Sequence, residues 1–307
     1  MTEKSILTYF ASSGQFTDSG KHLKAIQQLP DNITELTEIV QGLSIHMFTA
    51  NEFYKIKLDE VRIENEAHIR HFDKLLDKIL ELDNSIFEKP RPSDKKIVGV
   101  CHHFSKLLTG LLRAKKIPAR MRYGFGNYFN SGYYEDHSVC EYWNQQEKRW
   151  IVIDPQFDKV WIKNLGIKHK VFDVPNDKFF KLAESWILCR QSKLDPQKFG
   201  IFQPEMRGLW FIAGNLVKDV ASMQKQELLQ WDAWSGMPRP NNSMTNKKTL
   251  KFFDELAELM TQPDDNAEEI KKYYEQIAVP ERVFNAMHRH LEWLVDKPQK
   301  KVKNTSR

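Results

Sequence analysis

The sequence predicts an α+β fold in which a cysteine-bearing helix packs on an antiparallel sheet, with additional helices towards both ends of the chain. Three observations lead to this prediction. A leucine-rich helical pattern begins at Cys101. Two strand-like runs joined by a polar loop follow it, and helical patterns fill most of the chain before and after this region.

The helix that begins at Cys101 has one apolar face and ends before Pro118. The residues of this face recur at helical spacing: Phe104, Leu107, Leu108, Leu111 and Leu112. A helix N-terminus offers unpaired N–H groups and the positive end of the helix dipole, which favour a thiolate and can bind an oxyanion. Because buried, inert cysteine is the commoner use of this residue, the helix alone does not identify a nucleophile.

The two strand-like runs, 137–143 and 150–154, form a predicted hairpin. A four-residue loop between them pairs Val139 with Asp154, which makes His137 a diagonal neighbour of Asp154 on the same face. A two-residue loop pairs His137 with Asp154 directly. A slip of one residue would place the two side chains on opposite faces of the sheet.

Cys101, His137 and Asp154 together match the roles of nucleophile, base and orienting carboxylate. The chemistry that these roles predict is acyl transfer through a thioester, in which His137 moves the proton and Asp154 fixes the imidazole. Water as the acceptor gives hydrolysis, and an amine gives transamidation; the sequence leaves both open.

Four short motifs occur in order along the region 99–155. They are Gly99-Val100-Cys101 before a helix, Ile117-Pro118-Ala119-Arg120 entering a strand, Asp136-His137 before a strand, and Ile153-Asp154-Pro155. In these motifs the chain resembles the transglutaminase-like superfamily. The resemblance implies a papain-like core with Cys101, His137 and Asp154 as catalytic residues. The sequence differs from the family at His102, because an aromatic residue usually follows the cysteine there.

Longer runs are similar to a bacterial group of transglutaminase-domain proteins. These runs are 39–43, 134–143 and 207–212. This second resemblance implies the same fold and cysteine chemistry, and it implies no substrate.

Further residues are candidates for the same site. Gln41, on an expected helix over 33–48, is either a solvated side chain or an amide donor to the oxyanion. The candidates for the substrate pocket are His102, Tyr134, Trp143 and Trp210. For the tryptophans, packing in the core is the competing interpretation.

Other interpretations remain open at this stage. His102 and His103 compete as the base, although close neighbours of Cys101 on a helix point away from it. A metal site of His102, His103, His137 and Cys140 lacks any established ligand spacing, so no metal and no cofactor are expected. Two alternatives to the acyltransferase remain. One is a cysteine peptidase, and the other is a non-catalytic protein that binds a peptide or partner through the same fold.

Composition narrows the class of protein. The formal net charge of +5 equals the charge of the last eleven residues, so the body of the chain is near neutral and no nucleic-acid surface is expected. The odd set of Cys101, Cys140 and Cys189 argues against a disulfide framework. Without a secretory signal or a membrane span in the sequence, we expect a cytoplasmic protein acting on a peptide, a protein or a small amide. The oligomeric state is not indicated.

The chain divides into four expected parts. Residues 1–95 form the N-terminal helical part of the core, 96–175 the catalytic core, 176–296 a helical covering layer or subdomain, and 297–307 a basic disordered tail. Outside the catalytic core, helices are expected over 33–48, 64–87, 177–191, 207–229, 248–261, 265–277 and 280–295.

Overall fold

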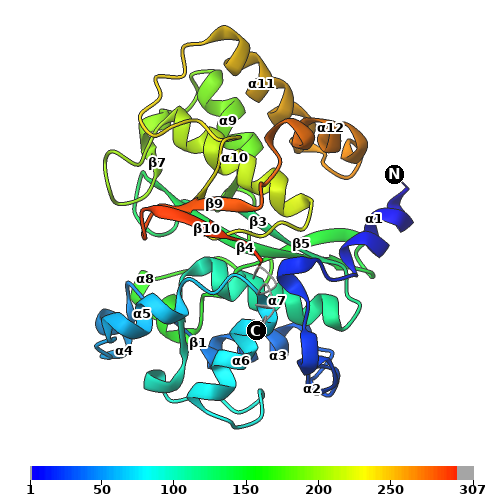
Figure 1. Cartoon of the computed structure of the whole chain (residues 1–307), viewed down its shortest axis with the longest axis vertical. Helices are drawn as coiled ribbons and strands as arrows, with labels where there is room; N and C mark the ends of the chain where they lie inside the picture. Colours follow the sequence, from blue (N-terminus) through cyan, green and yellow to red (C-terminus); the bar gives the residue numbers. More distant parts are fainter. Residues whose placement is uncertain (1, 296–307) are drawn as a thin grey trace, which may run out of the picture.

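The computed structural model describes residues 2–295 (Figure 1). Its α-helices are α1 (Glu3–Phe10), α2 (Leu23–Gln27), α3 (Ile33–Leu43), α4 (Ala50–Tyr54), α5 (Glu60–Glu66), α6 (Phe72–Leu82), α7 (Cys101–Ala114), α8 (Lys159–Leu165), α9 (Leu182–Arg190), α10 (Leu209–Met223), α11 (Lys247–Thr261) and α12 (Ala267–Ile277). Its strands are β1 (Ser44–His46), β2 (Ile97–Gly99), β3 (Ala119–Gly126), β4 (Tyr134–Asn144), β5 (Arg149–Ile153), β6 (Phe179–Lys181), β7 (Phe199–Gly200), β8 (Asp232–Ala233), β9 (Arg282–Asn285) and β10 (His290–Trp293). The predicted α+β fold, with the cysteine helix on an antiparallel sheet, is confirmed.

The central sheet has the strand order β5-β4-β3-β6, with β7 paired in parallel to the start of β4. β4 and β5 form the predicted hairpin, in which Asn144 pairs with Arg149 around a four-residue loop. Cys140 pairs with Ile153, so Asp154 follows at the level of Val139. The four-residue alternative was therefore the right one, and it brings the end of β5 towards His137.

The sheet lies between two groups of helices (Figure 1). On one side α7 packs with α3 and α6 in a core that also includes Ala119, Cys140 and Ile151 of the sheet. On the other side lie α9, α10 and α11. α10 seals the open edge of β3, where Asp219 accepts the Tyr123 N–H at 3.0 Å and Ser222 donates to the Met121 carbonyl at 2.7 Å. Pairing these backbone groups removes an exposed strand edge.

Buried ion pairs join the layers. Arg122 is fully buried between Asp219 of α10, at 2.7 Å, and Glu141 of β4, at 3.2 Å. Arg113 of α7 pairs with Glu227, beyond α10, at 2.6 Å. Charges buried in this way are tolerated only when they are paired, so the pairs specify how the layers meet.

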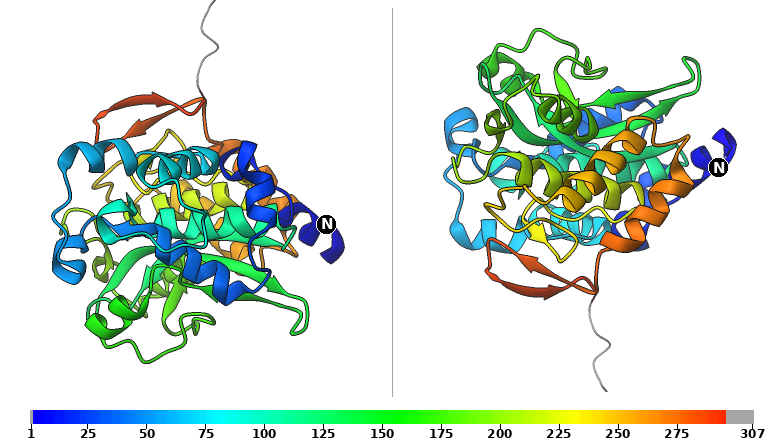
Figure 2. Two further views of the ribbon diagram at one scale, coloured as in Figure 1. Left: turned by 90° about the horizontal axis from the view of Figure 1, so that it is seen from below. Right: turned by 90° about the horizontal axis from the view of Figure 1, so that it is seen from above.

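Some sequence predictions of helices were wrong. Residues 280–295, expected as a helix, contain the antiparallel hairpin β9–β10, which lies beside the turn between α5 and α6 (Figure 2). Along β9, exposed Arg282 and Phe284 alternate with buried Val283 and Asn285, which is the period of a strand. The expected helix over 64–87 is interrupted between α5 and α6.

Two more helices are shorter than expected. The helix over 33–48 ends at Leu43, because Ser44–His46 pairs in parallel with Ile97–Gly99. The helix over 207–229 ends at Met223. The basic tail over 297–307 lies outside the described residues. Within residues 2–295, no helix combines the length and apolar character needed to cross a bilayer.

Candidate active site

Cys101 is the first residue of α7 and is 5% exposed. The turn before it is held by the Val100 N–H, which donates to Nδ1 of His103 at 3.1 Å. A Cβ atom at Gly99 would lie 2.5 Å from Cγ of His103, so only glycine fits this close approach. The sequence thereby fixes the sulfur at a helix N-terminus, as predicted.

His137 and Asp154 form a buried hydrogen-bonded pair. Nε2 of His137 lies 2.6 Å from Oδ2 of Asp154. The same carboxylate accepts the Tyr128 hydroxyl at 2.8 Å, and its Oδ1 accepts the Gln156 N–H at 3.2 Å. Because Nε2 faces Asp154, Nδ1 is the ring nitrogen left to interact with Cys101, whose side chain lies close enough to raise the pKa of His137. The structure thus brings the three predicted residues together.

The electrostatics favour a charged imidazole. Burial alone lowers the pKa of His137, but attraction and hydrogen bonds from Asp154 and Cys101 raise this pKa to about 10. An imidazolium at neutral pH is the form that pairs with a thiolate in cysteine enzymes. Burial raises the pKa of both Cys140 and Cys189 to about 12, so these two thiols stay protonated.

Gln230 is a site residue that the sequence analysis missed. Its Nε2 donates to Sγ of Cys101 at 2.7 Å and lies 3.4 Å from Oγ of Ser138. Its own carbonyl accepts from Lys218 of α10. The preceding residues are anchored as well, because the Tyr123 hydroxyl donates to the carbonyl of Leu228. No sequence signal marks Gln230, since it lies 129 positions after Cys101 in an irregular segment.

Gln41 does not occupy the predicted position. Its side-chain amide donates to the Phe157 carbonyl at 3.1 Å, and its main-chain carbonyl accepts from Lys96 at 2.8 Å. The side-chain amide on the sulfur belongs to Gln230 instead. The expectation that Gln41 supplies this donor was therefore wrong, because the end of α3 directs its amide to the segment after β5.

The four predicted pocket residues have other surroundings. His102 is fully buried, and its Nδ1 contacts the Tyr123 hydroxyl at 3.2 Å. Tyr134 stacks on Phe199 at 4.2 Å. Trp210 packs edge-on against the neighbouring ring of Phe211, at 5.6 Å.

Trp143 lies further from the site. It contacts Trp150 and lies six residues along β4 from His137, which is about 20 Å in an extended strand. This placement shows that the prediction of Trp143 as a pocket residue was wrong, whereas His102, Tyr134 and Trp210 stay predictions for the substrate pocket.

The competing histidines are poor bases. Burial is the main cause that lowers the pKa of His103 to about 3 and that of His102 well below its usual value. Both rings are neutral at pH 7, and the nearby Lys106 adds to the shift. His137 is the histidine that the structure places against Cys101.

Aromatic rings surround His137. Phe129 lies 5.0 Å from its ring, Phe157 6.1 Å and Phe179 6.4 Å. Trp161 of α8 extends this group by packing on Phe157 at 5.5 Å. Apolar rings of this kind exclude water, which strengthens the interaction between the imidazole and the carboxylate.

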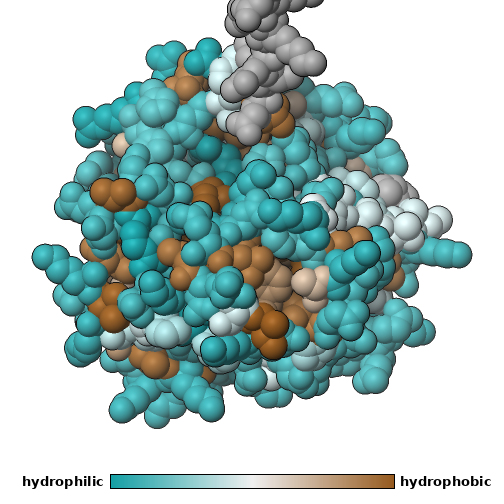
Figure 3. Space-filling model, turned by 60° about the horizontal axis from the view of Figure 1, so that its bottom comes forward, coloured by the Kyte–Doolittle hydropathy of each residue, from teal (hydrophilic) through white to brown (hydrophobic). Residues whose placement is uncertain are grey.

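The surface of the molecule is mainly hydrophilic. On the face that Figure 3 shows, hydrophobic residues form separate patches among polar ones. Phe48 and Phe202 are each 63% exposed, and their rings lie 6.1 Å apart. Phe48 also contacts His46, whose pKa burial and the charge of His137 lower to about 3. This exposed pair of rings therefore adjoins the surroundings of His137.

Comparison with known proteins finds similarity over part of the chain. Residues 70–155 match the family model of the transglutaminase-like superfamily, so the resemblance predicted from the motifs is confirmed for this segment. No curated protein matches the chain. Among solved structures, the chain is similar to a protein from Cytophaga hutchinsonii described as a "putative cysteine protease", with 16% identity and a TM-score of 0.34. The match covers 59% of this chain and 46% of that chain, less than half of its length.

Proposed function

We propose that this protein is a cysteine-dependent enzyme that cleaves an amide through a thioester, by hydrolysis or by acyl transfer to an amine. The observation that carries the proposal is the position of the His137 ring. It hydrogen-bonds Asp154 through Nε2 at 2.6 Å, and it lies close enough to Cys101 for the cysteine to raise its pKa. The segment that matches the transglutaminase-like superfamily contains all three residues.

The first half of the reaction forms the thioester. The Cys101 thiolate attacks the carbonyl carbon of the amide, and the carbonyl π electrons move to oxygen. N–H groups at the start of α7 and the amide of Gln230 stabilise the resulting oxyanion. When the oxyanion collapses, the C–N bond breaks and His137 gives its proton to the leaving amine.

The second half releases the acyl group. His137, now neutral, accepts a proton from water or from an acceptor amine as that molecule attacks the thioester. The C–S bond breaks, and the thiolate and imidazolium are restored. Asp154 holds the imidazole in one orientation and stabilises its charge in both halves. Because Cys101 is only 5% exposed, the half-buried Gln230 side chain must shift from the sulfur to admit the carbonyl.

A substrate screen tests the proposal. Unmodified peptides, peptides with an internal glutamine and simple primary amides are each incubated with the protein, with and without hydroxylamine as an amine acceptor. We expect release of amine or ammonia with one substrate class, a hydroxamate if acyl transfer occurs, and an acyl adduct on Cys101 by mass spectrometry. Cys101→Ser is the control and should abolish turnover.

The alternative is a non-catalytic protein that binds a peptide or partner through the same fold. Release at the same rate from Cys101→Ser, or no turnover and no acyl adduct with any substrate class, would favour this alternative over the enzyme.

A further inference from the structure

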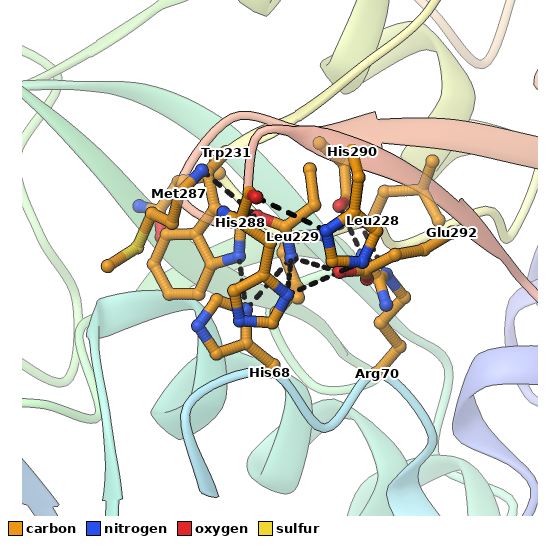
Figure 4. Close-up of polar contacts among 12 residues, drawn as sticks. His68, Arg70, Leu228, Leu229, Trp231, Met287, His288, His290 and Glu292 are labelled. Carbon is orange, nitrogen blue, oxygen red and sulfur yellow. Dashed lines mark hydrogen bonds and ion pairs between the residues drawn. The ribbon is translucent and has the colours of Figure 1, made fainter. Parts of the chain in front are cut away.

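The β9–β10 hairpin gathers a cluster of side chains that could hold a metal ion (Figure 4). His290 and Glu292 lie on one face of β10, and His288 lies in the turn just before it. One ligand atom from each of the three residues lies within 4.8 Å of the others. None of these residues takes part in the proposed reaction.

The hydrogen bonds of His290 leave one ring nitrogen unsatisfied. Its Nδ1 lies 3.2 Å from the carbonyl of His288, and because a carbonyl only accepts, Nδ1 carries the proton. In a neutral ring Nε2 then presents a lone pair, and it faces Oε1 of Glu292 at 3.4 Å. A lone pair and a carboxylate oxygen repel each other unless a cation or a proton lies between them.

His288 has the same conflict at the same oxygen. Its Nε2 lies 2.6 Å from a carboxylate oxygen of Glu64, whereas its Nδ1 contacts Oε1 of Glu292. A neutral imidazole has one N–H and cannot donate to both carboxylates. Nδ1 of His288 and Nε2 of His290 therefore converge on one carboxylate oxygen, an arrangement that a bound cation or a proton on the rings would stabilise.

We propose that His288 (Nδ1), His290 (Nε2) and Glu292 (Oε1) bind a divalent transition-metal ion of the zinc class. Two histidines and one glutamate are an established zinc ligand set that leaves a fourth position for water. In a tetrahedral site with bonds of ~2.1 Å, ligand atoms lie about 3.4 Å apart. Nε2 of His290 and Oε1 of Glu292 have this separation.

The surrounding contacts are those that metal ligands need. Nε2 of His288 lies 2.6 Å from a carboxylate oxygen of Glu64. Nδ1 of His290 contacts a backbone carbonyl, which fixes the tautomer of His290 that binds metal. Arg70 holds the other oxygen of Glu292 at 2.6 Å. The amide of Asn285, now 2.9 Å from Oε1 of Glu292, gives up this contact when the ion binds.

These residues lie in the segment 280–295 that was expected as a helix, and they were not among the candidate metal ligands considered from the sequence. On a helix, side chains two positions apart diverge, whereas on a strand they share a face. The run His288-Arg289-His290-Leu291-Glu292 therefore indicates a set of metal ligands only once β10 is known to be a strand. The ion would attach the hairpin more firmly to α5, which carries Glu64.

Direct metal binding tests this proposal. The full chain, free of any affinity tag and treated with chelator, is titrated with zinc chloride in competition with the chromophore pyridylazoresorcinol. We expect a single zinc ion per chain, and a visible absorption band when cobalt replaces zinc. Magnesium and calcium should not compete, because they prefer oxygen ligands to imidazole.

Variants identify the ligands. His290→Asn and Glu292→Gln should each weaken zinc binding by at least about tenfold, because even the loss of a supporting contact has an effect of this size. Glu281→Gln, an exposed acid at the start of the same hairpin, is the control and should bind like the unmodified chain. His290 is exposed, so its variant should fold normally, which its circular dichroism checks.

Two results would overturn the metal site: no retained zinc in the unmodified chain, or equal binding by His290→Asn. The first would mean that protons alone satisfy the two histidines.

Discussion

The side-chain amide of Gln230 donates a hydrogen bond to Sγ of Cys101 at 2.7 Å, across 129 positions of sequence. The residue lies on a segment whose carbonyls are bonded by Lys218 and Tyr123. An amide donor beside a nucleophile can stabilise an oxyanion once the side chain moves off the sulfur. Its contribution can be separated from the reactivity of the sulfur itself.

Gln230→Ala should slow acylation of Cys101 by p-nitrophenyl acetate by about a hundredfold, the usual effect of losing one oxyanion donor. Alkylation by iodoacetamide should change much less than acylation, because displacement at a saturated carbon forms no oxyanion and reports only the lost hydrogen bond to the sulfur. Both rates are measured under pseudo-first-order conditions. The matched control is Gln41→Ala, whose amide bonds to the Phe157 carbonyl and should affect neither rate. Equal slowing in the two variants would remove Gln230 from the mechanism.

Arg122→Leu should destabilise the fold by about 3–5 kcal/mol, because it leaves the buried carboxylate of Asp219 without its cationic partner. Glu141 keeps its ion pairs with Arg120 and Lys181. Arg122 is fully buried between Asp219 and Glu141. The free energy of unfolding from urea titration measures the loss. Arg149→Ala breaks an ion pair with Asp173 that is partly exposed on both sides, and it should cost less than about 1 kcal/mol. Similar losses in the two variants would show that the buried pairs do not join the layers.

The free energy of unfolding should depend on pH in the way that the titration of His137 predicts. Its pKa rises from an ordinary 6.5 to about 10 in the folded protein. Because the pKa of His137 is raised on folding, the protonated ring stabilises the folded state. This stabilisation is complete at pH values below the pKa of the unfolded chain and is lost as pH rises through about 10. Asp154→Asn removes the charge that raises the pKa of His137. We therefore expect this variant to lose less of its free energy of unfolding between neutral and alkaline pH than the unmodified chain, by on the order of 2 kcal/mol.

Urea unfolding at pH 7 and at about pH 10 checks this expectation for the unmodified chain and for Asp154→Asn. Groups that titrate in both proteins cancel in the comparison. Asp173→Asn, at a surface ion pair, is the control for loss of one carboxylate. The same alkaline loss in all three proteins would mean that Asp154 does not hold the imidazole charged.

The parts of the site that the sequence predicted depend on local structure. The alternation of β4 and β5 and the length of their loop determine that His137 and Asp154 share a face. Cys101 follows from the start of a strongly amphipathic helix. These features arise within one stretch of the chain, so their geometry can be worked out from residue spacing alone.

The parts that the sequence missed depend on distant contacts. Gln230 reaches Cys101 only because buried polar side chains of β3 and α10 hold its segment. The segment 282–293 contains good helix formers, yet β9 pairs with β8 and Arg70 holds Glu292. Tertiary pairing outweighs local propensity at such places, and periodicity in one segment does not reveal it.

The most direct test of the central claim is the rate at which iodoacetamide alkylates Cys101 at pH 7, with each cysteine followed by peptide mass spectrometry. The account predicts fast labelling of Cys101, slow labelling of Cys140 and Cys189, and a loss of at least about tenfold for Cys101 in His137→Ala. Slow labelling of Cys101 at equal rates in the unmodified chain and in His137→Ala would contradict it.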